Sequence, residues 1–168
     1  MPRILCVANK LLSIRDAIDI TDGEGNPAYR GKGQLVFLLS SKWQIYCGDS
    51  HVGSIRRRIL AWAPTWDISG ELGTFAIKRK RFALTRKYYA VGGPAHGATV
   101  TGNLWDRKFR VAREGETLAK ATGRVLAMRD RHIVEVLGQP ELFVVFAMLV
   151  LQMDRRDERR KKQMRRER

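Results

Sequence analysis

The chain has 168 residues, a net charge of +15 and two cysteines, Cys6 and Cys47. This length suits one domain with a core of its own, and two cysteines exclude a disulfide framework. A charge of this size favours phosphate-bearing partners, either nucleic acid or an anionic membrane surface.

The N-terminal residues MPRILCVANK contain a short apolar stretch without a cleavage-site pattern. They therefore predict no signal peptide. The two cysteines stand in neither a metal-binding nor a redox spacing. We expect a cytoplasmic protein, with peripheral attachment to a membrane left open.

Six segments of the chain repeat at a nearly constant spacing. The steps between them are 24, 24, 22, 22 and 22 residues, with starts at Lys10, Gln34, Arg58, Lys80, Gly102 and Arg124. The third position of every copy is apolar: Leu12, Val36, Leu60, Phe82, Leu104 and Leu126. The fifth is apolar in five of six copies: Ile14, Leu38, Trp62, Leu84 and Met128, with Asp106 as the exception. A fixed period indicates a repeated supersecondary unit.

Each copy combines two short runs of alternating apolar and polar residues, such as Leu12/Ile14 followed by Ile18/Ile20. Clusters of Gly, Asp and Glu, for example residues 22–25, separate the copies. Alternation interrupted by turn residues is typical of antiparallel hairpins. Six hairpins give twelve strands, and the missing Leu and Asn pattern excludes a leucine-rich solenoid.

An apolar helix is predicted at the C-terminus. Pro140 and Glu141 suit the first turn of a helix, and the ten residues Leu142–Leu151 are all apolar. Such a helix lies in a protein core or in lipid, and a membrane span needs about 20 apolar residues. We therefore expect a buried helix at about 140–153, with these structural residues: Leu142, Val145, Phe146 and Leu149.

A barrel of twelve strands has room for this helix. At about 4.8 Å spacing and a tilt near 40°, twelve strands close into a cylinder roughly 24 Å wide. Inward side chains leave about 12 Å, which matches one helix. The sequence predicts a mainly β fold, a twelve-stranded antiparallel closed barrel of six hairpins around a central C-terminal hydrophobic helix. Residues 1–153 form this domain, and residues 154–168 form a basic tail that is a helical extension or disordered.

Three parts of the chain carry a resemblance to a known family: residues 10–16 (KLLSIRD), residues 102–107 (GNLWDR) and the terminal apolar helix. The chain resembles the LURP-one-related proteins of the tubby-like superfamily, which also contains the phospholipid scramblases. The resemblance covers about Asn9 to Asp154 and implies a twelve-stranded barrel around a hydrophobic helix. We expect structural roles for Trp105, Asp106 and Arg107 within the second of these parts.

Basic residues gather at equivalent places of successive copies. The clusters 56–58 and 78–81 lie 22 residues apart, whereas 86–87 and 107–108 are predicted in tight turns. Neighbouring hairpins would merge these charges into one patch that binds an anion; alternatively, the charges only solubilise strand ends and turns. The candidate anion-binding residues are Arg56, Arg57, Arg58, Lys78, Arg79, Lys80, Arg81, Arg86 and Lys87.

The aromatic residues Trp43, Trp62, Trp66, Trp105, Phe82 and Tyr88 mostly fall in the apolar columns, and we expect them in the core. Tyr89, outside the columns and beside Lys87, is expected to be exposed. The histidines have no metal-ligand spacing, and no side chain has a recognisable nucleophile context. We therefore predict no catalytic residue, no metal and no cofactor.

The leading hypothesis is a non-enzymatic barrel that binds a phospholipid headgroup or an anionic membrane surface. It combines the resemblance with a charge of +5 in residues 154–168 and +10 in the remaining 153 residues. One alternative is a nucleic-acid-binding protein that uses the basic barrel face and the tail. A further alternative is scramblase-like lipid transfer, which requires the apolar helix to leave the barrel.

Overall fold

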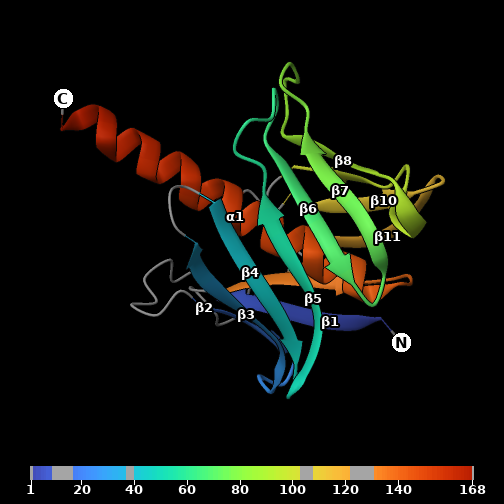
Figure 1. Cartoon of the computed structure of the whole chain (residues 1–168). Coiled ribbons are helices and arrows are strands. Elements are labelled where there is room, and N and C mark those ends of the chain that lie inside the picture. The colour runs from blue at the N-terminus through green and yellow to red at the C-terminus, as the bar shows by residue number, and fades with distance from the viewer. Residues whose placement is uncertain (1, 9–16, 37–39, 103–107, 122–130, 168) are drawn as a thin grey trace.

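The computed structural model describes residues 2–8, 17–36, 40–102, 108–121 and 131–167. Twelve strands and one long helix make up the fold, with a short 3-10 turn at Gly93–Ala95 (Figure 1). The strands are β1 Arg3–Ala8, β2 Ala17–Asp22, β3 Pro27–Val36, β4 Ser40–Cys47, β5 Ser50–Arg57, β6 Thr65–Gly70, β7 Gly73–Arg79, β8 Lys87–Val91, β9 Thr99–Thr101, β10 Arg110–Arg113, β11 Glu116–Ala121 and β12 Arg131–Val136. The helix α1 spans Glu141–Arg166.

The strands form a closed antiparallel barrel in sequence order, in which β1 pairs with β12. Closure leaves no edge strand with unpaired backbone groups. Because consecutive strands alternate in direction, the tight connections β2–β3, β4–β5, β6–β7, β8–β9 and β10–β11 all lie at one end, here called the turn end. The connections β5–β6 and β7–β8 lie at the opposite end. The predicted twelve-stranded barrel is confirmed.

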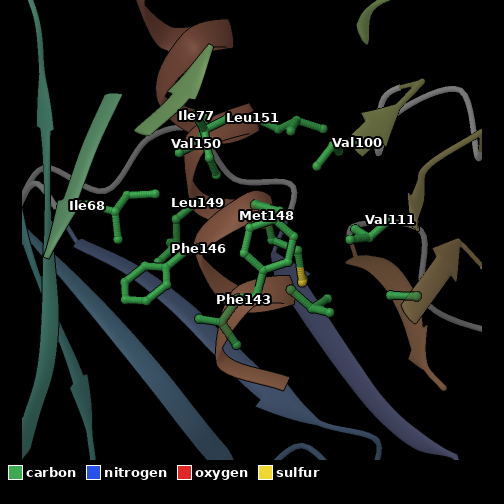
Figure 2. Packing of buried hydrophobic residues seen from close by; sticks show 14 of the residues in the cluster. Ile68, Ile77, Val100, Val111, Phe143, Phe146, Met148, Leu149, Val150 and Leu151 are labelled. Atoms are coloured by element: carbon green, nitrogen blue, oxygen red, sulfur yellow. The ribbon is translucent and has the colours of Figure 1, made fainter. Parts of the chain in front are cut away.

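The apolar half of α1 fills the barrel. Figure 2 shows Phe143, Phe146 and Leu149 of α1 among inward side chains of the strands, including Ile68 and Ile77. Every residue from Phe143 to Asp154 is buried. Leu142, at the entrance, is partly buried, whereas Val145, Phe146 and Leu149 are almost completely enclosed. The expected central helix is therefore confirmed.

One glycine permits the helix to lie close to the wall. A Cβ atom on Gly53 of β5 would stand 2.7 Å from the Phe146 ring and 2.8 Å from the Ser69 carbonyl oxygen. Both distances are far shorter than ordinary van der Waals contact. The absence of a side chain at Gly53 thus lets a large aromatic side chain of α1 reach the backbone of the sheet.

The position of the repeat within the barrel differs from the prediction. In the copies that start at Arg58 and Lys80, the first run is the connection 58–64 or 80–86, and only the second run is a strand. The turns predicted between copies are the tight hairpin turns themselves, such as Cys47–Ser50 between β4 and β5. Each period is therefore one hairpin plus one connection.

This shift changes which aromatic residues are buried. Trp43, Trp66 and Tyr88 lie in the core as predicted, and Tyr89 is exposed as predicted. The core positions predicted for Trp62 and Phe82 are wrong, because both side chains are exposed on the connections. Their alternation imitates that of a strand. Trp105 lies outside the described residues.

The predicted tight-turn position of one basic pair, Arg86 and Lys87, also needs correction. Arg86 ends the connection between β7 and β8, and Lys87 is the first residue of β8. The predicted turn at the second pair is not tested, because Arg107, like Asp106, falls outside the described residues, and Lys108 lies just before β10 without regular secondary structure.

The helix continues well beyond the barrel. Its 26 residues correspond to a length of about 39 Å, and the part after Asp154 emerges from the end opposite the turn end (Figure 1). Residues 159–167 are exposed. Among the described residues, no helix is long and apolar enough to cross a membrane.

Replacement of a buried α1 residue by a charged one tests the filling of the barrel. Val145→Asp places an unpaired carboxylate in the core, which costs several kcal/mol, so we expect unfolded or aggregated protein. The control Met164→Asp makes the same change on the exposed part of α1 and should stay within about 0.5 kcal/mol of the parent. Equal thermal melting temperatures for the two variants would contradict the filled-barrel packing.

Candidate anion-binding site

The two basic clusters meet at the end of the barrel from which α1 emerges. Arg56 and Arg57 end β5, and Lys78 and Arg79 end β7. The backbone N–H of Arg79 donates to the carbonyl oxygen of Pro64 at 2.9 Å, which joins the end of β7 to the connection between β5 and β6. We call this end the cationic end; its residues are Arg56, Arg57, Arg58, Lys78, Arg79, Lys80, Arg81, Arg86 and Lys87.

Charge is distributed unevenly between the two ends. Residues 56–64 and 78–87 contain no carboxylate. At the turn end, the tight turns and the strand residues beside them contain one cation, Arg113, in the described part of the chain. They contain six carboxylates: Asp22, Glu24, Asp49, Glu71, Glu114 and Glu116. The described part of the barrel is therefore electrostatically polar along its axis, with its positive end beside the basic extension of α1.

Part of the cationic end serves to hold α1. The Arg79 guanidinium donates to Asp154 at 2.9 Å and to Glu158 at 2.6 Å. Asp154 is only 2% exposed, and the buried Tyr88 hydroxyl donates to the same carboxylate at 2.6 Å. Burial of a carboxylate is costly unless the group is paired and hydrogen-bonded. Arg79 and Tyr88 supply the pairing and the hydrogen bonds.

Two further ion pairs belong to the same contact between α1 and the strand ends, here called the junction. Arg86 donates to Glu158 at 2.5 Å, and Arg57 forms an ion pair with Asp157. Burial opposes the charge of Glu158, but hydrogen bonds from Arg79 and Arg86 outweigh it and hold the pKa of Glu158 below its ordinary value. For Asp157, burial prevails over Arg57, and its pKa is raised.

The pKa of Tyr88 is raised mainly by burial and then by the Asp154 carboxylate. Its hydroxyl therefore stays protonated and remains a hydrogen-bond donor. For Arg79, burial favours the neutral form, but hydrogen bonds to Asp154 and Glu158 outweigh it and raise the pKa of Arg79. The junction is thus a hydrogen-bonded network of arginines, carboxylates and one tyrosine hydroxyl.

The nine candidate residues fall into three groups. Arg57, Arg79 and Arg86 bind carboxylates of α1. Arg58 pairs with Asp67 on β6, and Arg81 donates to the carbonyl oxygen of Trp62 at 3.0 Å. The last group has no ion-pair partner in the part of the chain that the structure describes: Arg56, Lys78, Lys80 and Lys87.

An open pocket adjoins the first cluster. It has a volume of about 370 Å³ and is lined by Arg56, Arg57, Arg58, Ile59, Leu60 and Asp67. Three guanidinium-bearing residues beside two aliphatic side chains suit a ligand with both a phosphate group and an apolar part. Asp67 already engages Arg58 through both guanidinium nitrogens, at 2.8 and 2.7 Å.

The sequence analysis does not predict that carboxylates of α1 bind arginines of the cationic end. The sequence predicts one basic tail at residues 154–168, although Asp154, Asp157 and Glu158 have the spacing i, i+3, i+4. That spacing places three carboxylates on one face of a helix. An acidic face on a basic helix is the signal from which the junction could have been predicted.

Other site chemistries find little support. Within the described ranges, no group of three or more His, Cys, Asp or Glu side chains could hold a metal ion. Residues 22–26 form the hairpin turn between β2 and β3, in which the Asp22 carboxylate accepts from the backbone N–H groups of Glu24 and Asn26, each at 2.9 Å.

Comparison with known proteins identifies the family. The sequence model of the LURP-one-related family matches residues 3–152. The chain belongs to this family. A search of curated proteins finds no match.

One solved structure supports the fold of this LURP-one-related protein. An X-ray structure of a protein from Arabidopsis thaliana is 17% identical and has a TM-score of 0.64. The match covers 91% of this chain and 90% of the Arabidopsis chain. At this identity, the similarity concerns the fold alone.

A comparison of two arginines tests the junction. Arg79→Ala leaves the buried Asp154 carboxylate without its guanidinium partner, and we expect the free energy of unfolding to fall by about 3 kcal/mol or more. Arg58→Ala breaks a pair whose side chains are 52% and 39% exposed, so its loss should be about 1 kcal/mol or less. Urea denaturation of both variants checks this; equal losses would contradict a structural role specific to Arg79.

Two truncations locate the end of the structural part of α1. Ending the chain after Met153 removes all three junction carboxylates and should destabilise the protein by more than about 2 kcal/mol. Ending it after Glu158 retains them and should change stability by about 1 kcal/mol or less. Thermal unfolding of both proteins checks the difference, and a large loss in the longer one would show that residues 159–168 also contribute.

Proposed function

We propose that this protein is a non-enzymatic barrel that binds anionic phospholipid headgroups at a membrane surface through its cationic end. The observation that carries the proposal is the axial separation of charge. The unpaired cations and the basic extension of α1 lie at one end, whereas the carboxylates of the tight turns lie at the other. Such a molecule orients its positive end toward an anionic surface.

The open pocket favours a lipid headgroup over a nucleic acid. Beside its guanidinium groups stand Ile59 and Leu60, which suit the apolar part of a lipid and offer no surface for stacking of bases. Sequence-tolerant recognition of single strands uses aromatic side chains as stacking platforms among the cations. The pocket has no such platform among its lining residues.

The proposal concerns binding of lipid rather than its movement across a bilayer. Residues Phe143 to Asp154 are buried inside the barrel. Release of this segment would expose the whole core, which opposes a mechanism in which it enters lipid. We place the protein in the cytoplasm, peripheral to the membrane, as part of the same proposal.

Flotation with vesicles tests the proposal. We expect the protein to bind phosphatidylcholine vesicles that contain phosphatidylserine and to be released by salt, but not to bind pure phosphatidylcholine. Arg56→Gln with Lys80→Gln removes two cations that have no carboxylate partner in the described structure. At about 1 kcal/mol for each cation near the surface, binding should weaken by roughly tenfold or more.

The matched control is Arg30→Gln with Arg113→Gln, which removes the same charge near the turn end, where Arg30 lies in the first half of β3 and Arg113 ends β10. We expect it to bind almost as the parent does. Equal weakening in both double variants would show that only net charge matters. Displacement from vesicles by a nucleic-acid competitor at equal phosphate concentration would favour the nucleic-acid alternative.

A further inference from the structure

Two connections at the cationic end carry large apolar side chains that are almost fully exposed. Leu60 and Trp62, between β5 and β6, are 99% and 87% exposed, and Phe82 and Leu84, between β7 and β8, are 89% and 110% exposed. These are the four most exposed large hydrophobic side chains in the described part of the chain. A contiguous exposed apolar surface of this kind marks an interaction site.

The two connections are held side by side. The base of each is closed by a backbone hydrogen bond, from Arg58 to Thr65 at 2.9 Å and from Lys80 to Lys87 at 2.8 Å. Farther out, the Arg81 guanidinium lies 5.0 Å from the centre of the Trp62 ring, in a cation–π contact. Together they present one surface, here called the apolar tip: Leu60, Trp62, Phe82 and Leu84.

The order of residue types is the same in both connections. Residues 56–62 read RRRILAW and residues 78–84 read KRKRFAL, so that cations come first and apolar residues come after them. Since β5 and β7 both run toward this end, the cations stand at the strand ends and the apolar residues stand in the connections beyond them. The molecule therefore has an apolar layer in front of a cationic layer.

A bilayer surface has the complementary order. A protein that approaches an anionic membrane meets the phosphate groups first and the acyl chains behind them. Apolar and aromatic side chains enter the boundary between headgroups and acyl chains, while Lys and Arg remain at the level of the phosphates. The two layers of the cationic end have this arrangement.

We propose that the apolar tip inserts into the headgroup–acyl boundary of an anionic bilayer while the cations behind it bind the phosphates. This inference rests on the proposed function and adds to it the mode of attachment. The absence of carboxylates from residues 56–64 and 78–87 favours an anionic bilayer over a second copy of the chain, whose corresponding surface has the same charge.

Fluorescence quenching by brominated lipid tests insertion. The probe is phosphatidylcholine vesicles that contain phosphatidylserine, with bromine on the acyl chains. Trp105 is replaced by Phe in every protein of this comparison. Trp43 and Trp66 are buried in the barrel, so we expect the quenching to come from Trp62. Trp62→Phe keeps an aromatic side chain at the tip and should still bind these vesicles, with most of the quenching lost.

A second variant measures how much the tip contributes to binding. Phe82→Ser with Leu84→Ser changes only exposed side chains, so its melting temperature should equal that of the parent. We expect at least about tenfold weaker partitioning into the same vesicles because less apolar area leaves water. The control Leu137→Ser removes a partly exposed apolar residue directly after β12 at the turn end and should bind as the parent does.

The outcomes separate this inference from the proposed function. Salt-sensitive binding without quenching of Trp62, or with full affinity in the serine variant, overturns insertion and leaves electrostatic binding intact. No binding to anionic vesicles at low salt overturns both. A lipid-free dimer that the serine variant converts to a monomer in sedimentation analysis would assign the tip to contact between copies and overturn insertion.

Discussion

The whole structure depends on one helix that fills a barrel too wide to fill itself. Twelve strands enclose more space than their inward side chains occupy, and α1 occupies the remainder from Phe143 onward. Because the helix is continuous, its packing in the core also fixes the position of its C-terminal half. Burial of α1 from Phe143 to Asp154, with Phe146 close to Gly53, therefore sets where Asp154 and Glu158 meet the strand ends. The ion-pair junction is a consequence of core packing.

Closure of an even number of antiparallel strands divides the connections between two ends. The tight hairpin turns collect the carboxylates at one end, and the connections 58–64 and 80–86 collect cations and apolar residues at the other. Within the cationic end, the arginines bound to α1 connect the strand ends to the helix.

The fold could be predicted from the sequence because it depends on period and composition. A 22- to 24-residue repeat and one apolar C-terminal segment already specify hairpins around a helix. The burial of individual residues could not be predicted in the same way. Leu60 and Trp62 are spaced like residues of a strand. In the structure, however, they lie in the connection between the end of β5 and the start of β6. Alternation of apolar and polar residues shows only how these residues are spaced along the chain. It does not show on which side of the barrel wall, or at which end of the barrel, a side chain lies.

The candidate site shows the same limit in its charges. The sequence alone does not distinguish one arginine or lysine of the cationic end from another. The structure shows which of them are partly buried in ion pairs and which are exposed to water. Asp154 is buried and has Arg79 as its guanidinium partner, so Arg79 contributes to the stability of the folded protein. Arg56 and Lys80 remain exposed and hydrated, so their charges act on any anion that approaches from solution. Loss of an arginine that binds α1 therefore lowers the stability of the protein. Loss of an exposed cation such as Arg56 or Lys80 instead weakens the attraction for an anion.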